Sequence, residues 1–214
     1  MREGVSDPIE FWFDFGSGYA YFAHLEIGKI ERETGRPVLW RPFLLGAAFK
    51  ATGAQSLTST PMKGDYARRD WQRLAVLRGL RFTPPANHPV VALAPSRIFY
   101  GLEEQNRALA NEFAAACFHR YYNDGQDITD DGVLIRCLDE VGASKSCLAF
   151  AHDEPFKAIL KSRGAEALSK GVFGSPFFLW RGEPFWGADR IDMLIDWIMR
   201  NERTNGLPAA GSIG

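Results

Sequence analysis

The sequence predicts an α/β fold in which the two ends of the chain build one mixed sheet, with a long all-helical insertion between them. Three observations support this fold class. An apolar run, a helical pattern and a second apolar run open the chain in the order βαβ. A long stretch of helical spacing without strand signals follows. Two short apolar runs joined by a tight turn, and then one amphipathic helix, close the chain in the order ββα.

The first unit spans residues 9–42. Ile9 to Phe13 is a short apolar run typical of a buried strand, and Val38 to Pro42 is a second one. Between them, apolar residues recur at helical spacing and predict one helix that ends near Gly35; they are Tyr19, Phe22, Ala23, Ile27 and Ile30. Two strands joined by a helix form a βαβ unit, so we expect them to be parallel with a right-handed crossover.

From Leu44 to about Lys170 the pattern is helical. Three helices are predicted by apolar spacing, at Ala67, Trp71, Leu74 and Ala75; at Leu109, Phe113, Ala116, Cys117 and Tyr121; and at Val133, Leu134, Cys137, Leu138 and Val141. Asp130 is the expected N-cap of the third, and Phe150 to Leu168 is expected to be helical again. Loops are predicted at Pro84-Pro85, around His88-Pro89 and at Asn123-Asp124-Gly125.

The last unit returns to strands. Phe177 to Trp180 and Glu183 to Trp186, joined by Arg181-Gly182, predict an antiparallel hairpin. A closing helix follows from the spacing of Ile191, Leu194, Ile195, Ile198 and Met199. Both ends are needed to bury one core, so residues 1–45 plus 170–204 are expected to form a split domain. Residues 46–169 are then an insertion that covers it as a lid, and 205–214 a flexible tail.

Composition excludes several classes of protein. The formal net charge of -1 gives no general attraction for nucleic acid, and no apolar run is long enough to span a membrane. The segment from Pro61 to Arg81 is locally basic, which is typical of a solvated helix face and also compatible with a cationic wall for anionic small molecules. The N-terminus lacks the apolar core of a signal peptide.

The cysteines argue against metal and dithiol chemistry. Cys117, Cys137 and Cys147 are an odd set without a Cys-x-x-Cys pair, and none lies at the first helix. We therefore expect three buried, reduced thiols and a reducing cytoplasm as the compartment.

Ser17 is the most informative single residue. It lies in residues 15–19, Phe-Gly-Ser-Gly-Tyr, where the first strand turns into the first helix. A hydroxyl at that turn, next to the positive end of a helix, is a good place to hold an anion such as a thiolate. It is equally typical of an ordinary helix N-cap. Much later, Gly174-Ser175-Pro176 precedes another strand and is expected to form a second wall of the same site.

Three segments carry a resemblance to a known family. They are residues 13–21 (Phe-Asp-Phe-Gly-Ser-Gly-Tyr-Ala-Tyr), 41–53 (Arg-Pro-Phe-Leu-Leu-Gly-Ala-Ala-Phe-Lys-Ala-Thr-Gly) and 171–178 with 185–190 (Gly-Val-Phe-Gly-Ser-Pro-Phe-Phe and Phe-Trp-Gly-Ala-Asp-Arg). The chain resembles the 2-hydroxychromene-2-carboxylate isomerases and the kappa-class glutathione transferases, and the isomerases more closely. The resemblance extends to about Arg203 and implies a thioredoxin-like, DsbA-related fold with a helical insertion.

The resemblance also implies a glutathione site. Ser17 matches the serine that donates a hydrogen bond to the glutathione sulfur and so favours the thiolate. Pro176 matches a cis-proline, which would expose the backbone of Ser175 for strand-like pairing with glutathione. Asp189, which is also a candidate N-cap, would bind the γ-glutamyl ammonium of glutathione. Arg190 is either a surface charge or a bridge to the α-carboxylate of the same glutamyl group.

Lys63 and Tyr66 lie where the insertion would approach the cleft. Lys63 is either a solvated side chain or the partner of a glycyl or substrate carboxylate. Two positions depart from the family. Gly18 replaces a proline, which would hold Ser17 less firmly, and Ala54-Gln55 stand where an asparagine is usual.

The function implied is a glutathione-dependent isomerase of aromatic-compound breakdown. It would interconvert 2-hydroxychromene-2-carboxylate and trans-o-hydroxybenzylidenepyruvate, with glutathione as a regenerated cofactor and Trp71 and Phe82 as an apolar wall for the substrate ring. A conjugating transferase that consumes glutathione and a non-catalytic binding protein on the same fold are the alternatives. The family also suggests a homodimer.

Overall fold

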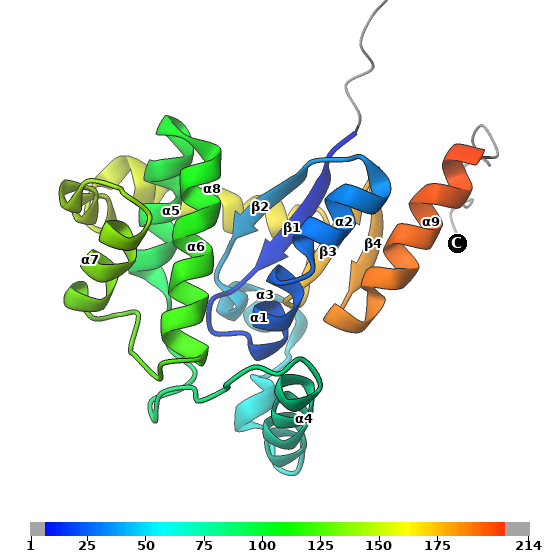
Figure 1. Ribbon diagram of the computed structural model, residues 1–214, viewed down its shortest axis with the longest axis horizontal. Coiled ribbons are helices and arrows are strands. Elements are labelled where there is room, and N and C mark those ends of the chain that lie inside the picture. Colours follow the sequence, from blue (N-terminus) through cyan, green and yellow to red (C-terminus); the bar gives the residue numbers. More distant parts are fainter. Residues whose placement is uncertain (1–6, 204–214) are drawn as a thin grey trace, which may run out of the picture.

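The computed structural model describes residues 7–203, and the predicted sheet is present (Figure 1). β1 (Ile9–Phe13), β2 (Val38–Pro42), β3 (Phe177–Trp180) and β4 (Glu183–Trp186) lie in the order β2-β1-β3-β4. β1 and β2 are parallel, and β3 is antiparallel to β1 and β4. These strands have the predicted bounds, so the βαβ and ββα assignments are confirmed. The tail predicted at 205–214 lies outside the described residues.

Both faces of the sheet are buried. On one face, the Phe11 ring stacks on Phe13 and on Phe178, with centroids 4.9 and 5.0 Å apart. On the other face, Trp12 meets Phe43 edge to face at 6.2 Å. Helices α1 (Gly18–His24), α2 (Ile27–Thr34) and α6 (Arg107–Tyr122) cover the first face, and α3 (Leu45–Thr52) and α8 (Glu154–Ser169) cover the second. Because helices pack on both faces of the sheet, the ends of its strands are held in place by the core.

The prediction of a single helix after β1 is wrong. The segment forms two helices, α1 (Gly18–His24) and α2 (Ile27–Thr34). The Nδ1–H of His24 donates to the carbonyl of Tyr21. In a continuous helix that carbonyl would accept from the amide of Leu25, which instead bonds to the carbonyl of Ala23. Gly35 ends α2 in the left-handed conformation, as predicted.

The insertion is helical as predicted, but it contains more helices than the spacing indicated. The expected helices correspond to α4 (Lys63–Leu77), α6 (Arg107–Tyr122) and α7 (Asp131–Glu140), and the side chain of Asp130 caps α7 by accepting from the amide of Val133 at 3.0 Å. The helix predicted over 150–168 is mostly α8 (Glu154–Ser169). Its first two residues belong to the end of a 3-10 helix, η2 (Lys145–Ala151).

Two helices were not predicted, α3 (Leu45–Thr52) and α5 (Leu93–Gln105). The first is short, and the second carries Pro95 in its first turn and Gly101 in its interior, where the Phe150 ring packs against the glycine. The remaining elements are η1 (Leu57–Ser59), η3 (Ala188–Arg190) and α9 (Ile191–Arg203). One core runs from the sheet into α5, α6 and α7, so the insertion is packed on the sheet; the proposed division at 45/46 and 169/170 stays a prediction.

Cys117, Cys137 and Cys147 are free and buried, as expected. Within residues 7–203, no helix combines the length and apolar character needed to cross a bilayer.

Candidate functional site

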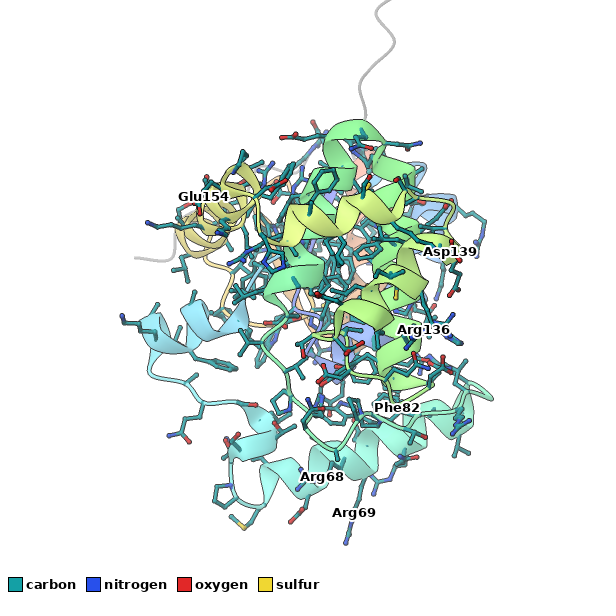
Figure 2. All side chains as sticks on the ribbon, turned by 90° about the vertical axis from the view of Figure 1, so that its left-hand side faces the viewer. Arg68, Arg69, Phe82, Arg136, Asp139 and Glu154 are labelled. Carbon is teal, nitrogen blue, oxygen red and sulfur yellow. The ribbon has the colours of Figure 1, made fainter. Side chains whose placement is uncertain are left out.

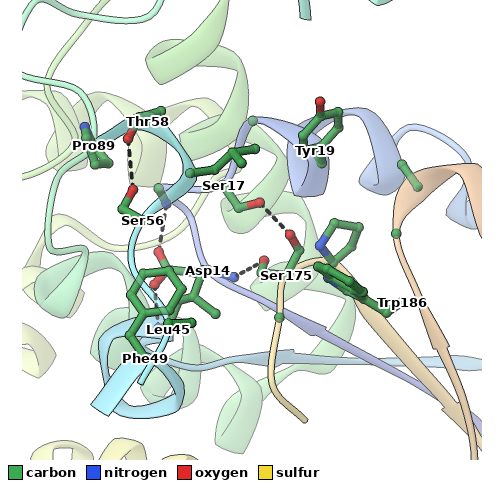
Figure 3. Close-up of a pocket in the computed structure, with 18 of the residues that line it drawn as sticks. Asp14, Ser17, Tyr19, Leu45, Phe49, Ser56, Thr58, Pro89, Ser175 and Trp186 are labelled. Atoms are coloured by element: carbon green, nitrogen blue, oxygen red, sulfur yellow. Dashed lines mark hydrogen bonds between the residues drawn. The ribbon is translucent and has the colours of Figure 1, made fainter. Parts of the chain in front are cut away.

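A cavity of about 1410 Å³ opens at the end of the sheet where β1 leads into α1. Figure 3 shows a close-up of it. Its walls come mainly from four parts of the chain: the turn at 14–19, the α3 to α4 region, the segment 89–91, and the segments 173–176 and 186–190. The cavity therefore joins both ends of the chain to the insertion. The six residues that the sequence analysis assigned to a glutathione site all line it: Ser17, Lys63, Ser175, Pro176, Asp189 and Arg190.

Ser17 and Ser175 meet at the base of this cavity. The Ser17 hydroxyl donates to the Ser175 carbonyl at 2.8 Å, and the Ser175 hydroxyl accepts from the amide of Asp14 at 2.8 Å (Figure 3). The Ser175-Pro176 peptide bond is cis, as predicted. The Ser17 oxygen also accepts from the Ala20 amide at 3.3 Å, so the N-cap interpretation is confirmed. A cap uses the oxygen, and the hydroxyl proton is the part that can serve a ligand.

Asp14 is a site residue that the sequence did not single out. Its carboxylate accepts from the amide of Gly16 at 2.8 Å and from the amide of Leu45 at 2.7 Å. Burial raises the pKa of Asp14, while the two amide bonds work in the opposite direction. Asp14 thus ties the end of β1 to the start of α3 and fixes the cavity floor. Its position directly after a buried strand is the signal that was available.

Asp189 and Arg190 lie at the rim that faces the C-terminal half. They belong to η3, just before α9, and their side chains form an ion pair of 3.3 Å. Asp189 is 72% exposed and Arg190 is 48% exposed, so both charges are accessible to a ligand. Trp186, also exposed, lines the cavity beside them and meets Phe173 edge to face.

Lys63 lies at the rim that belongs to the insertion. It is the first residue of α4, and within the described part of the chain its ammonium group has no ion-pair partner. The preceding residue, Met62, has a φ of 64°, and the Lys63 amide donates to the carbonyl of Pro61 at 2.7 Å. This γ-turn is a strained conformation for a residue with a side chain. No pattern in the sequence predicts this turn.

The rest of the basic segment is largely paired. Arg68 bonds to Asp65 at 2.7 Å, and Arg73 lies 3.7 Å from Asp70. Arg78, which reaches the cavity, lies 3.5 Å from Glu26. Figure 2 shows Arg68 and Arg69 on the outer side of α4. Arg68, Arg69 and Arg73 form the solvated helix face of the first interpretation, and of this basic segment Lys63 and Arg78 line the cavity.

Of the two residues expected to form an aromatic wall, one lines the cavity and the other does not. Trp71 lines the cavity. Phe82 is in the core, where its ring stacks between Phe22 at 5.3 Å and Tyr122 at 5.2 Å, and it does not line the cavity. The spacing of apolar residues cannot distinguish a core ring from a cavity ring. The segment Pro89 to Val91 lines the cavity instead and follows a cis His88-Pro89 bond.

Comparisons with known proteins agree with this geometry. The family model of the DSBA-like thioredoxin domain matches residues 8–198. A 2-hydroxychromene-2-carboxylate isomerase of Sphingobium xenophagum is 26% identical over 91% of this chain and 100% of its own length. Glutathione S-transferase kappa 1 of Caenorhabditis elegans is 24% identical over 90% of this chain and 91% of its own. A solved 2-hydroxychromene-2-carboxylate isomerase superposes with a TM-score of 0.82 at 24% identity, covering 92% of this chain and 97% of that one.

Proposed function

We propose, since the chain belongs to the DSBA-like thioredoxin domain family, that it is a glutathione-dependent isomerase that interconverts 2-hydroxychromene-2-carboxylate and trans-o-hydroxybenzylidenepyruvate. The observation that carries the proposal is the contact between the Ser17 hydroxyl and the cis-proline turn at Ser175, at the base of the large cavity. When bound, glutathione would supply a sulfur nucleophile that is returned unchanged at the end of the cycle.

Ser17 provides the donor for the sulfur. Its oxygen stays fixed by the Ala20 amide at 3.3 Å, while its proton turns from the Ser175 carbonyl toward the cavity. A free thiol with a pKa near ~8.5 is mostly protonated at neutral pH, and a hydrogen bond to the charged form lowers that pKa. α1 has only seven residues, so the lower thiol pKa is assigned to the Ser17 hydroxyl and not to the end of the helix.

Ser175 and Pro176 provide the backbone contact. When the Ser17 proton turns away, the Ser175 carbonyl becomes free to accept from a main-chain amide of the tripeptide. The Ser175 hydroxyl is held by the Asp14 amide at 2.8 Å, so the turn keeps its position during this exchange.

The charged rim residues fit the ends of glutathione. Asp189 offers a carboxylate for the γ-glutamyl ammonium, and Arg190, its ion-pair partner, offers a guanidinium for the adjacent carboxylate. Lys63 at the opposite rim offers an ammonium group for the glycyl carboxylate or for the carboxylate of the substrate. Apolar side chains such as Leu45, Phe49 and Leu57 line the insertion side and offer an apolar surface for an aromatic ring. These assignments are part of the proposal.

The test is turnover of 2-hydroxychromene-2-carboxylate by the purified protein with and without glutathione. We expect activity only with glutathione. Ser17→Ala should lower it by roughly 10- to 100-fold, since a hydrogen bond to a charged group contributes ~1.5–3 kcal/mol. Ser17→Thr keeps a hydroxyl at an extended cap position, where a β-branched residue fits, and is the matched control. Equal rates in the two mixtures would reject the proposed role of the thiolate.

A conjugating transferase is the second candidate, and the match to the kappa 1 transferase favours it. Stoichiometry separates the two: a transferase consumes one glutathione per product, and an isomerase leaves its concentration unchanged. If titration calorimetry detects no binding of glutathione, the non-catalytic binding protein remains. The cytoplasmic location and the homodimer also stay proposals, and gel filtration with light scattering tests the latter.

A further inference from the structure

Gly18, directly after Ser17, is covered by the indole ring of Trp71. A β-carbon built on Gly18 would lie 2.5 Å from Cε2 of Trp71, and 2.9 Å from both Cδ2 and Cζ2. Such separations do not occur between real side chains. Gly18 is not among the glycines with a positive φ, so its backbone would accept an alanine. The need for glycine at this position is therefore a need for space, and Trp71 occupies that space.

Trp71 has little freedom to move. Only 3% of its surface is exposed, although it reaches the cavity. Its ring is enclosed by Tyr19 at 5.8 Å, Phe82 at 5.9 Å and His88 at 5.5 Å between centroids. The ring is thus wedged between α1, the core and the segment before Pro89, and it offers too little free face to stack on a substrate.

A second contact fixes the same two helices relative to each other. The Tyr19 hydroxyl donates to the carboxylate of Asp70, the neighbour of Trp71, at 3.0 Å. Residues 18 and 19 of α1 are therefore both bound to residues 70 and 71 of α4. On its other side Ser17 is held by its own amide, which donates to the Asp14 carbonyl at 3.0 Å. The start of α1 is positioned from the insertion through Trp71 and from the sheet through Asp14.

We propose that Trp71 is a positioning residue for Ser17 and that Gly18 is the glycine that admits it. The indole rests on the backbone that follows the serine, so α4 of the insertion sets the direction of the Ser17 hydroxyl. The inference rests on the proposed function, because it concerns how well that hydroxyl reaches a bound sulfur. It also gives Gly18 a structural reason: a larger residue there would displace either the indole or the serine turn.

Five proteins test the inference: the wild type, Gly18→Ala, Trp71→Leu, the double variant and the control Gly164→Ala. Gly164 is a helical glycine of α8 with nothing within 4 Å of its added β-carbon. The readout is the pKa of the thiol of bound glutathione, followed by ultraviolet absorbance of the thiolate across pH, together with the melting temperature. A merely structural role would move the melting temperature and leave this thiol pKa unchanged.

We expect Gly18→Ala and Trp71→Leu each to raise the pKa of the bound thiol by about one unit, which is a tenfold lower ratio of thiolate to thiol at a given pH. The double variant should recover most of it, since the alanine methyl group then fills part of the space vacated by the indole. Gly164→Ala should match the wild type. If Gly18→Ala does not fold, Trp71→Phe, which keeps an aromatic ring but withdraws it from Gly18, should show the same loss.

The outcomes separate the two proposals. A wild type that binds glutathione as a thiolate, with no change in Gly18→Ala or Trp71→Phe, overturns the positioning role and leaves the proposed function intact. A double variant no better than either single variant also overturns it. A wild type that forms no thiolate with glutathione overturns the proposed function, and the positioning role with it.

Discussion

His24 should make the protein sensitive to mild acid. Burial lowers the pKa of His24 to about 4, against an ordinary value of 6.5. The folded state therefore favours the neutral ring, whereas the unfolded chain takes up a proton already near pH ~6.5. The contribution to stability is present above the unfolded pKa and is lost as the pH falls toward the folded value. The ring stacks on Phe118 at 4.8 Å, and its bond to the Tyr21 carbonyl raises the pKa but is outweighed by burial.

The magnitude follows from the two pKa values. For a group with pKa 6.5 unfolded and about 4 folded, proton linkage gives a loss of about 2 kcal/mol in the free energy of unfolding between about pH 7 and about pH 5. The assay is urea unfolding at both pH values. His24→Phe keeps a ring against Phe118 and cannot titrate, so its loss over the same interval should be smaller by that amount. Equal losses in the two proteins would refute the reasoning.

Three further predictions concern the cavity and the core. Asp14→Asn should cost about 1–3 kcal/mol, because one amide, that of Gly16 or of Leu45, loses its acceptor. Burial raises the pKa of Asp14, so the wild type loses stability as the pH rises through the pKa of the folded state, and the asparagine variant does not. Urea unfolding should therefore show that the difference in the free energy of unfolding between the two proteins narrows as the pH rises; a constant difference would contradict this. Phe82→Ala should lower stability by about 3–5 kcal/mol, with the glutathione affinity of the folded fraction unchanged in calorimetry; a weaker affinity would mean that Phe82 supports the site, either directly or through the Trp71 ring that it contacts. Lys63→Gln should raise KM for glutathione or for the anionic substrate about tenfold, whereas Arg69→Gln on the outer side of α4 serves as the matched control; equal effects would mean that only general charge matters.

The strands and the meeting of the two turns were predictable because they depend on local signals. Ile9 to Phe13 and Phe177 to Trp180 are apolar runs of strand length with turns beside them, and their bounds are as predicted. The topology then requires the turn at Ser17 to face the turn at Ser175, whatever lies between them in the sequence.

What could not be predicted depends on contacts between residues far apart in the sequence. The break between α1 and α2 arises because the His24 ring takes the Tyr21 carbonyl, and the spacing of apolar residues carries no information about that choice. Phe82 and Trp71 have the same apolar character, yet one stacks in the core and the other covers Gly18. From the sequence, Gly18 predicts only added backbone freedom. The position of the Trp71 indole shows that a glycine is required there.

The Ser17 hydroxyl has one proton, and that limits how the site can work. In the structure described here the proton is engaged with the Ser175 carbonyl at 2.8 Å, so a bound sulfur must displace an existing hydrogen bond. The exchange is close to balanced if the freed carbonyl accepts from the tripeptide backbone, because each donor and acceptor is then paired before and after binding. A ligand that offers a thiolate without a main-chain amide would leave the carbonyl unpaired. With glutathione bound as proposed, the same turn would therefore favour a thiol carried by a peptide over a simple thiol, since only the former satisfies both groups.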